Sequence, residues 1–445
     1  MNFHPLRPQG MGRFPRLSPV SKGGLPWNAF MPGCWVLPWV AVSILSCGFE
    51  PATAVLWTDR PEFALYAEYF NSSQERYKIE TRYYEFPAQR LTETTESPDI
   101  VVGNWLKSVS TRRLFTPLNR FFTRDQVAKN AFYPRLLALG NIENKQYLLP
   151  VAFNIPAIVF ARANGSLLSN PFTVTFEELK ALGIGYNMGQ NGIYSRMGFS
   201  PAWNDEFLFV ATTLFNVSFR EADPLTWDPE ALEQAIAYLR NWTQESNTSI
   251  QAEDEFVFKY CYDPPAKLAA SGRILFTYLN SMDFFTLTQE SRTNLDFRWL
   301  AEQDTIPLFE ETVYYGIYKK GKAKKAAAAF TQWFFQAETQ RFLLEISRNQ
   351  GIHETLFGIS SGFSALRTVT EQIFPRFYPD LLGHTPPDDF MAPPNILPRH
   401  WNSLKEQVIL PYLRDRIRQA GEAVPRPLER RVNDWYRINN FSHTE

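Results

Sequence analysis

Residues 148–161 read LLPVAFNIPAIVFA, an apolar stretch interrupted by Pro150 and Pro156. One plain strand does not hold an internal proline easily, because proline removes a hydrogen-bond donor from the ladder. Two strands that meet at a kink fit this pattern better. A crossing between two lobes needs such a kink, so the stretch predicts a two-lobed molecule.

The chain before this stretch alternates short strands with helices. Residues 54–57 (AVLW) and 99–102 (DIVV) are apolar runs typical of buried strands, and 78–86 alternates as a strand does. Residues 62–70 carry aromatic side chains at helical spacing. Strand, helix, strand, helix and strand in this order predict a parallel sheet with right-handed crossovers, and hence the α/β fold class.

Helical and apolar patterns continue after the crossing stretch. The predicted elements are a helix capped by Thr175, a long helix at 228–244, strands at 274–276 and 314–318, a long helix at 322–347, and closing helices at 404–420 and 427–436. Prolines crowd 374–398, which predicts a loop or linker. With 445 residues the chain is too long for one ordinary core and fits two lobes.

The composition narrows the possible function classes. A net charge of −1 gives no support to a nucleic-acid partner, which needs a positive surface. Five scattered histidines lack metal-ligand spacing, so we expect no metal and no other cofactor. Aromatic residues make up 15% of the chain; they serve as core by default, but they also line pockets for ring-shaped ligands.

The N-terminal segment 1–46 is similar to an export signal. Its last part, 34–46, is apolar and uncharged, too short to span a bilayer comfortably, and follows a basic segment without acidic residues. The run ends before Cys47 as in a bacterial lipobox, although Leu45 stands where a smaller residue is commoner. We expect a lipid on Cys47 that anchors the protein to a membrane, with 47–53 as a tether. An uncleaved anchor and a plain signal peptide are the alternatives.

If the signal is removed before Cys47, Cys261 is the one thiol left in the folded body, which excludes a disulfide framework.

Several fragments, in their order and spacing, resemble the extracellular solute-binding proteins of ABC importers, the sugar-binding branch in particular. The fragments are 98–102 (PDIVV), 116–119 (TPLN), 147–150 (YLLP), 172–179 (FTVTFEEL) and 315–340. Three places depart from the family pattern: Asn119 stands in place of Asp, Phe176 in place of Trp, and 159–162 (VFAR) where the family usually has Tyr-Tyr-Asn. The resemblance covers about 54–347 and weakens after Gly358.

The resemblance implies a periplasmic-binding-protein fold, with two hinge-linked α/β lobes and a ligand cleft between them. It places 54–152 and 306–347 in the first lobe and 153–305 and 348–445 in the second. It also implies a receptor rather than an enzyme. Such a receptor captures a small solute, here a carbohydrate, and delivers it to an ABC permease at the cell envelope. Enclosure between lobes desolvates a sugar and gathers hydrogen-bond partners around its hydroxyls.

The candidate ligand-binding residues follow predicted strands or flank the predicted crossing. They are Trp57, Thr58, Asp59, Asn104, Trp105, Asn154, Trp203, Tyr278, Asn280 and Ser281. Each has a structural alternative: the aromatic rings can serve as core, and the short polar side chains can cap helices.

Two other function classes stay open on the sequence. A glycoside hydrolase needs two carboxylates across a cleft, and Asp59 with Glu311 is the pair available for that role. A surface adhesin or structural lipoprotein would keep the fold without the transport role, since a fold does not fix a function.

Overall fold

The computed structural model describes residues 51–190, 192–419 and 425–439. The expected signal at 1–46 and the expected lipidation site Cys47 lie outside these residues. Within the described ranges, every helix is too short or too polar to cross a membrane.

The first β-sheet is mixed: β3, β1 and β2 at one end run parallel, and the other pairs are antiparallel. Among the described residues it holds six strands in the order β15, β6, β14, β3, β1 and β2. Their bounds are β1 Ala52–Thr58, β2 Tyr77–Tyr83, β3 Ile100–Gly103, β6 Leu149–Phe153, β14 Val313–Ile317 and β15 Phe363–Ser364. Strand β1 pairs in parallel with both β2 and β3, which confirms the predicted parallel arrangement. Strand β14 is antiparallel to β3 and β6.

The kinked stretch 148–161 forms two strands that belong to different sheets. Strand β6 pairs with β14 and β15, whereas β7 (Pro156–Ala161) pairs with β11 and β12. The second sheet has the order β11, β7, β12 and β8 within the described residues, with bounds β8 Thr173–Val174, β11 Phe276–Asn280 and β12 Leu295–Leu300. The predicted crossing between two sheets is therefore confirmed.

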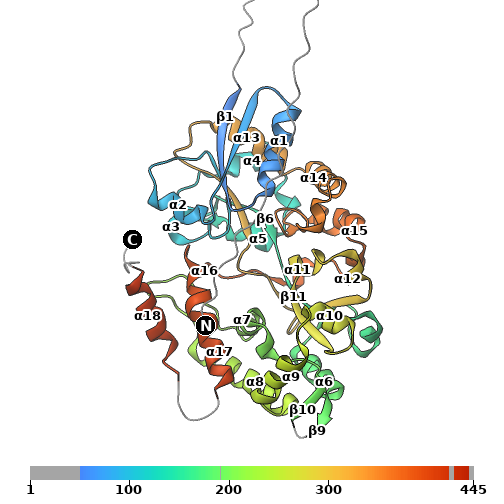
Figure 1. The fold of residues 1–445 in the computed structure, drawn as a ribbon. Coiled ribbons are helices and arrows are strands. Elements are labelled where there is room, and N and C mark those ends of the chain that lie inside the picture. The colour runs from blue at the N-terminus through green and yellow to red at the C-terminus, as the bar shows by residue number, and fades with distance from the viewer. Residues whose placement is uncertain (1–50, 191, 420–424, 440–445) are drawn as a thin grey trace, which may run out of the picture. The chain divides into compact units, whose positions relative to one another are not determined.

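Helices surround both sheets (Figure 1). Those before the crossing are α1 Glu62–Ser73, α2 Pro87–Glu93, α3 Val109–Arg112, α4 Asn119–Thr123 and α5 Pro134–Leu139. The middle group comprises α6 Phe176–Tyr186, α7 Asp205–Leu214, α8 Pro229–Asn247, α9 Ile250–Tyr260, α10 Pro265–Ala270, α11 Ser281–Phe285 and α12 Gln289–Thr293. The last are α13 Lys324–Phe334, α14 Ala337–Asn349, α15 Phe374–Phe377, α16 Trp401–Leu404, α17 Leu410–Arg418 and α18 Leu428–Ile438.

Local signals explain where several helices begin. The Thr175 side chain accepts a hydrogen bond from the Glu178 amide, so the predicted cap of α6 is confirmed. Asp228 accepts from two amides of the first turn of α8, and Pro229 occupies the first helical position, where its missing N–H costs nothing.

Two predicted elements were wrong in their bounds. The single helix expected at 322–347 is two helices, α13 and α14, because Phe334 and Phe335 are both buried. Consecutive helical side chains point about 100° apart, so a break after Phe334 lets both rings pack inward. The strand expected at 274–276 is β11 at Phe276–Asn280, because its pairing with β7 extends as far as Pro156.

Three further segments differ from the predicted organisation. Residues 348–445 were placed with the second lobe, yet β15 lies within them and pairs with β6 of the first sheet. The tether predicted at 47–53 overlaps β1, whose residues Ala52 and Thr53 already pair with β2. The proline-rich segment 374–398 contains helix α15 and strand β16 (Met391–Ala392), which pairs with β13 (Ile306–Pro307).

Alternating strand residues supply two hydrophobic clusters. Leu56 and Val102 belong to one cluster, while Trp57 and Val101 belong to the other. This follows from the two-residue period of a strand, whose side chains alternate between the faces of the sheet. The cluster with Trp57 also contains Trp401 and residues of α17, a helix that packs on α7 and α8.

Replacing Gly316 of β14 with alanine is expected to lower the free energy of unfolding by about 1–3 kcal/mol through overpacking. A Cβ atom at this position would lie 2.4 Å from Phe115 and 2.8 Å from Leu148. Urea unfolding followed by tryptophan fluorescence measures the change. Gly185→Ala in α6 is the matched control, because a Cβ there meets nothing within 4 Å. Equal stability of the two variants would contradict the packing argument.

Candidate functional site

The carboxyl ends of β1, β2 and β3 meet at one edge of the first sheet, because these strands run parallel. Chain reversals after parallel strands place polar side chains at such an edge, the usual ligand position in open α/β sheets. Asp59 and Arg60 follow β1, and Asn104 and Trp105 follow β3. The segment 83–88 ends β2 and begins α2.

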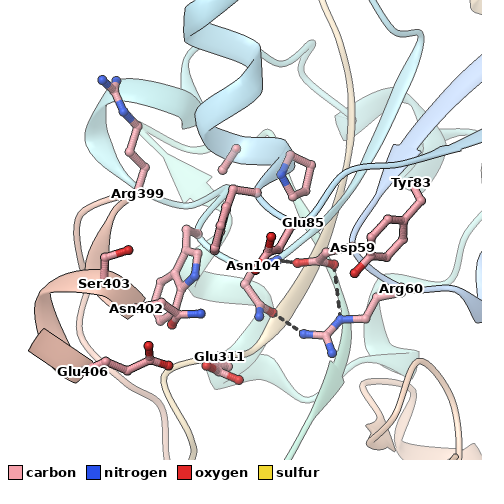
Figure 2. Close-up of a pocket in the computed structure, with 14 residues that line it drawn as sticks. Asp59, Arg60, Tyr83, Glu85, Asn104, Glu311, Arg399, Asn402, Ser403 and Glu406 are labelled. Atoms are coloured by element: carbon pink, nitrogen blue, oxygen red, sulfur yellow. Dashed lines mark hydrogen bonds and ion pairs between the residues drawn. The ribbon is translucent and has the colours of Figure 1, made fainter. Parts of the chain in front are cut away.

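Asp59, Arg60 and Asn104 are joined in one polar cluster (Figure 2). The Nε of Arg60 lies 3.3 Å from Oδ1 of Asp59, and its Nη2 donates to Oδ1 of Asn104 at 2.8 Å. The amide N–H of Asn104 donates to Oδ2 of Asp59 at 3.3 Å. Burial raises the pKa of Asp59, while Arg60 and the Asn104 amide partly offset that shift. The cluster fixes the ends of β1 and β3 to one another.

Two backbone features bring these strand ends close together. A Cβ atom on Gly103 would lie 2.8 Å from Pro87 and 3.0 Å from the Asp59 carboxylate, so only glycine permits this approach. Trp105 adopts the left-handed conformation, with a φ of 62°. A bulky residue there costs on the order of 1–3 kcal/mol, and such strain is concentrated at ligand sites.

A pocket of about 270 Å³ opens at this sheet edge, and we call it the strand-edge pocket. Its opposite wall in Figure 2 comes from 399–406, which includes α16. It is lined by Asp59, Arg60, Tyr83, Glu85, Phe86, Pro87, Ala88, Asn104, Trp105, Glu311, Arg399, Asn402, Ser403 and Glu406. This volume is near the lower end of small-molecule sites, roughly 300 Å³, so the pocket suits a small solute.

Many polar groups in the strand-edge pocket have no partner within the protein. Among the described residues, the side chains of Glu85, Glu311, Asn402, Ser403 and Glu406 form no hydrogen bond or ion pair. Two aromatic side chains stand at the same wall: Tyr83 is 61% exposed and Phe86 is 39% exposed. Unsatisfied donors and acceptors next to exposed rings are the surface that a polar ring-shaped ligand requires.

A buried ion-pair network lies behind the wall formed by 399–406. The Nζ of Lys405 contacts Glu310 at 2.5 Å and Glu206 at 2.7 Å. The indole N–H of Trp401 also donates to Glu310. These contacts join the C-terminal segment to the start of α7 and to the connection before β14.

Three of the ten predicted site residues line the strand-edge pocket: Asp59, Asn104 and Trp105. Trp57 is fully buried and packs on Tyr84, with ring centroids 4.8 Å apart. Thr58 is also buried, and its hydroxyl accepts from the Arg60 amide. Strand β1 is covered on both faces, so its last side chains pack inward.

The other five predicted residues lie away from this pocket. Asn154 follows β6 and bridges two segments, accepting from the Ser281 hydroxyl and donating to the Ser361 carbonyl. Asn280 caps α11, and Tyr278 lies within β11 and is buried against Phe207. Trp203 stacks on Phe256, with centroids 5.9 Å apart. All five make contacts inside the protein.

Sequence reasoning missed the pocket residues supplied by two segments. The segment 83–88 had a usable signal, because it ends a strand parallel to β1 and so reaches the same edge. The wall at 399–406 had none, since the distant packing of Trp401 on Phe209 and Phe219 positions it. Glu311 was not among the ten candidate ligand-binding residues, although it was considered as one member of a hydrolase pair.

Among the residues that the structure describes, no group of three or more His, Cys, Asp or Glu side chains could hold a metal ion.

Solved structures of several binding proteins share this fold. An ABC substrate-binding protein from Listeria monocytogenes, in complex with cycloalternan, has 14% identity and a TM-score of 0.56, covering 87% of this chain and 99% of its own. The sugar-binding protein MalE from Xanthomonas citri has 11% identity and a TM-score of 0.60, covering 87% and 96%. The GacH receptor of Streptomyces glaucescens, studied with acarbose, has 16% identity and a TM-score of 0.53, covering 87% and 97%. At these identities the likeness establishes the fold alone.

No curated protein matches the chain in sequence. A family model does match: residues 66–349, more than half of the chain, fit the model described as bacterial extracellular solute-binding protein. The parallel strands of the first sheet, the crossing at 148–161 and the pocket at the strand ends agree with that match. The chain therefore belongs to the family of bacterial extracellular solute-binding proteins.

Proposed function

We propose that this protein is the receptor of an ABC importer and captures a small carbohydrate in the strand-edge pocket. The observation that carries the proposal is the combination of unpartnered polar side chains and exposed aromatic rings around one cavity of about 270 Å³. A sugar offers hydroxyls for the polar groups and apolar C–H faces for the rings. The structures of similar fold that are named for sugars or acarbose support this ligand class.

Direct contact with the ligand is proposed for Asp59, Asn104 and Trp105, together with Tyr83 and Asn402. Asp59 and Asn104 keep acceptor capacity beyond the bonds that hold their cluster. Tyr83 and Asn402 make no side-chain hydrogen bond to the described residues, so a ligand can use them without disrupting the fold.

The proposal also includes attachment of the receptor to the membrane and delivery of the ligand to the permease. The lipobox-like sequence before Cys47 supports an acyl anchor, which would hold the receptor at the membrane that contains the permease. The division into lobes 54–152 with 306–347 and 153–305 with 348–445 is kept in outline, except that β15 joins the first sheet. Hinged closure of such lobes would present a liganded surface to the permease.

The hydrolase alternative finds little support in the geometry. A glycosidase needs one carboxyl group as an acid and a second as a nucleophile or base. Both oxygens of Asp59 already contact Arg60 or the Asn104 amide. Asp59 is therefore not free to serve with Glu311 as a pair of catalytic carboxyl groups.

A thermal-shift screen of monosaccharides, oligosaccharides, polyamines and amino acids tests the proposal. A sugar present at about 1,000 times its Kd should stabilise the protein by about 4 kcal/mol. Recovery of the sugar unchanged would exclude hydrolysis. A stabilising response to amino acids alone would contradict the carbohydrate assignment.

Tyr83→Ala is expected to weaken sugar binding about tenfold, since covering an exposed ring face contributes on the order of 1–2 kcal/mol. The side chain is 61% exposed, so its removal should leave the fold intact. Titration calorimetry measures the Kd. Tyr262→Ala is the matched control, because this tyrosine is 79% exposed and does not line the pocket. Equal losses in both variants, or no loss in Tyr83→Ala, would remove this ring from the site.

A further inference from the structure

The strand-edge pocket contains more carboxylates than cations. Its charged lining consists of Asp59, Glu85, Glu311 and Glu406 against Arg60 and Arg399. Arg60 is already engaged by Asp59 and Asn104. Three carboxylates then face one guanidinium, and none of the three is paired within the described residues.

The one remaining guanidinium is directed elsewhere. In Figure 2 the head group of Arg399 points away from Glu311 and Glu406. Its charge acts on Glu221 outside the pocket, where it helps to lower a pKa that burial has raised. Glu311 and Glu406 are both exposed, and neither side chain makes a hydrogen bond or ion pair with the described residues.

The layer behind the pocket adds negative charge. Lys405 is shared between Glu310 and Glu206, which leaves that group with one uncompensated negative charge. Lys107 is buried over the Tyr314 ring and does not line the pocket, and burial lowers its pKa to about 7.

We propose that the natural ligand carries a protonated amine: an amino sugar whose ammonium lies against Glu311 and Glu406. This inference rests on the proposed carbohydrate-binding function and specifies its ligand class. A cation at this end of the pocket relieves the repulsion among these carboxylates. The exposed ring of Tyr83 favours the same ligand, since aromatic faces attract cations as well as sugar C–H groups.

Titration calorimetry with a matched sugar series tests the inference. The series is glucose, glucosamine, N-acetylglucosamine and glucuronic acid, with the corresponding disaccharides, at about pH 6, where amines are protonated. The amine is expected to bind at least about tenfold more tightly than its neutral counterparts, with a preference that falls as salt is added. The acid is expected to bind most weakly.

Two other outcomes are distinguishable. Equal or tighter binding of the neutral or acidic sugars would overturn the amino-sugar inference and leave the proposed function standing. Failure of every sugar to bind would overturn both.

Variants test whether the two glutamates cause the preference. In Glu311→Gln/Glu406→Gln the ratio of neutral to amine Kd is expected to fall from about ten to about one. Glu290→Gln, an exposed change in α12 outside the pocket, is the control and should retain the full ratio. Persistence of the preference in the double variant would contradict the placement of the ammonium.

Discussion

Replacing Lys405 with methionine is expected to lower the free energy of unfolding by about 3–5 kcal/mol, because it breaks a buried ion pair and leaves one partner uncompensated. The lysine ammonium is the shared partner of Glu310 and Glu206. Glu310 is buried, so its carboxylate cannot turn to water, whereas the Glu206 side chain is 41% exposed. Most of the loss should therefore come from Glu310. Urea unfolding at neutral pH measures it.

A double variant distinguishes the loss of the ion-pair attraction from the cost of leaving the buried Glu310 carboxylate unpaired. Lys405→Met/Glu310→Gln removes both members of the buried pair and should recover much of the loss, since paired removal is often nearly neutral. Lys267→Met is the matched control: it breaks an exposed pair with Asp263 and should cost less than about 1 kcal/mol. A loss below 1 kcal/mol in Lys405→Met would show that the network contributes little.

The same network explains why the C-terminal segment belongs to the site. The family match ends at residue 349, yet Asn402, Ser403 and Glu406 form a wall of the strand-edge pocket. Lys405 and Trp401 hold that wall through Glu310. A part of the chain outside the matched region thus forms part of the pocket lining.

Short-range patterns were sufficient to predict the sheet edge at which the strand-edge pocket opens. The apolar runs at 54–57 and 99–102 identified two strands, and their parallel pairing brings Asp59 and Asn104 to one edge. Proline chemistry alone predicted the crossing at 148–161. These features depend on neighbours in sequence, so they can be interpreted without knowledge of the tertiary structure.

The features that the sequence patterns did not predict depend on packing between segments distant in the chain. The alternation of 78–86 continues past the end of β2, because the hydrophobic pattern does not indicate where pairing with β1 stops. Tyr278 lies inside β11 because β7 extends the ladder beyond the apolar run. Nothing near Asn402 in the sequence indicates a site, since its position depends on α7.

Trp401→Ala is expected to cost about 3–5 kcal/mol of stability, the usual loss when a fully buried large aromatic is truncated. The ring is completely buried and packs on Phe209 and Phe219, with centroids 5.9 Å and 5.6 Å away. Its removal leaves a cavity beneath α16 and takes away the hydrogen bond to Glu310. Thermal and urea unfolding of the variant measure the loss.

Sugar binding by Trp401→Ala tests whether the segment 399–406 forms part of the binding site. Because Trp401 immediately precedes Asn402 and Ser403 in α16, a loosened helix should weaken sugar binding even though the indole does not line the pocket. Trp401→Phe retains most ring contacts and should lose only a fraction of both stability and affinity. If Trp401→Ala lowers stability as expected but binds sugar with unchanged Kd, the C-terminal segment does not form part of the binding site.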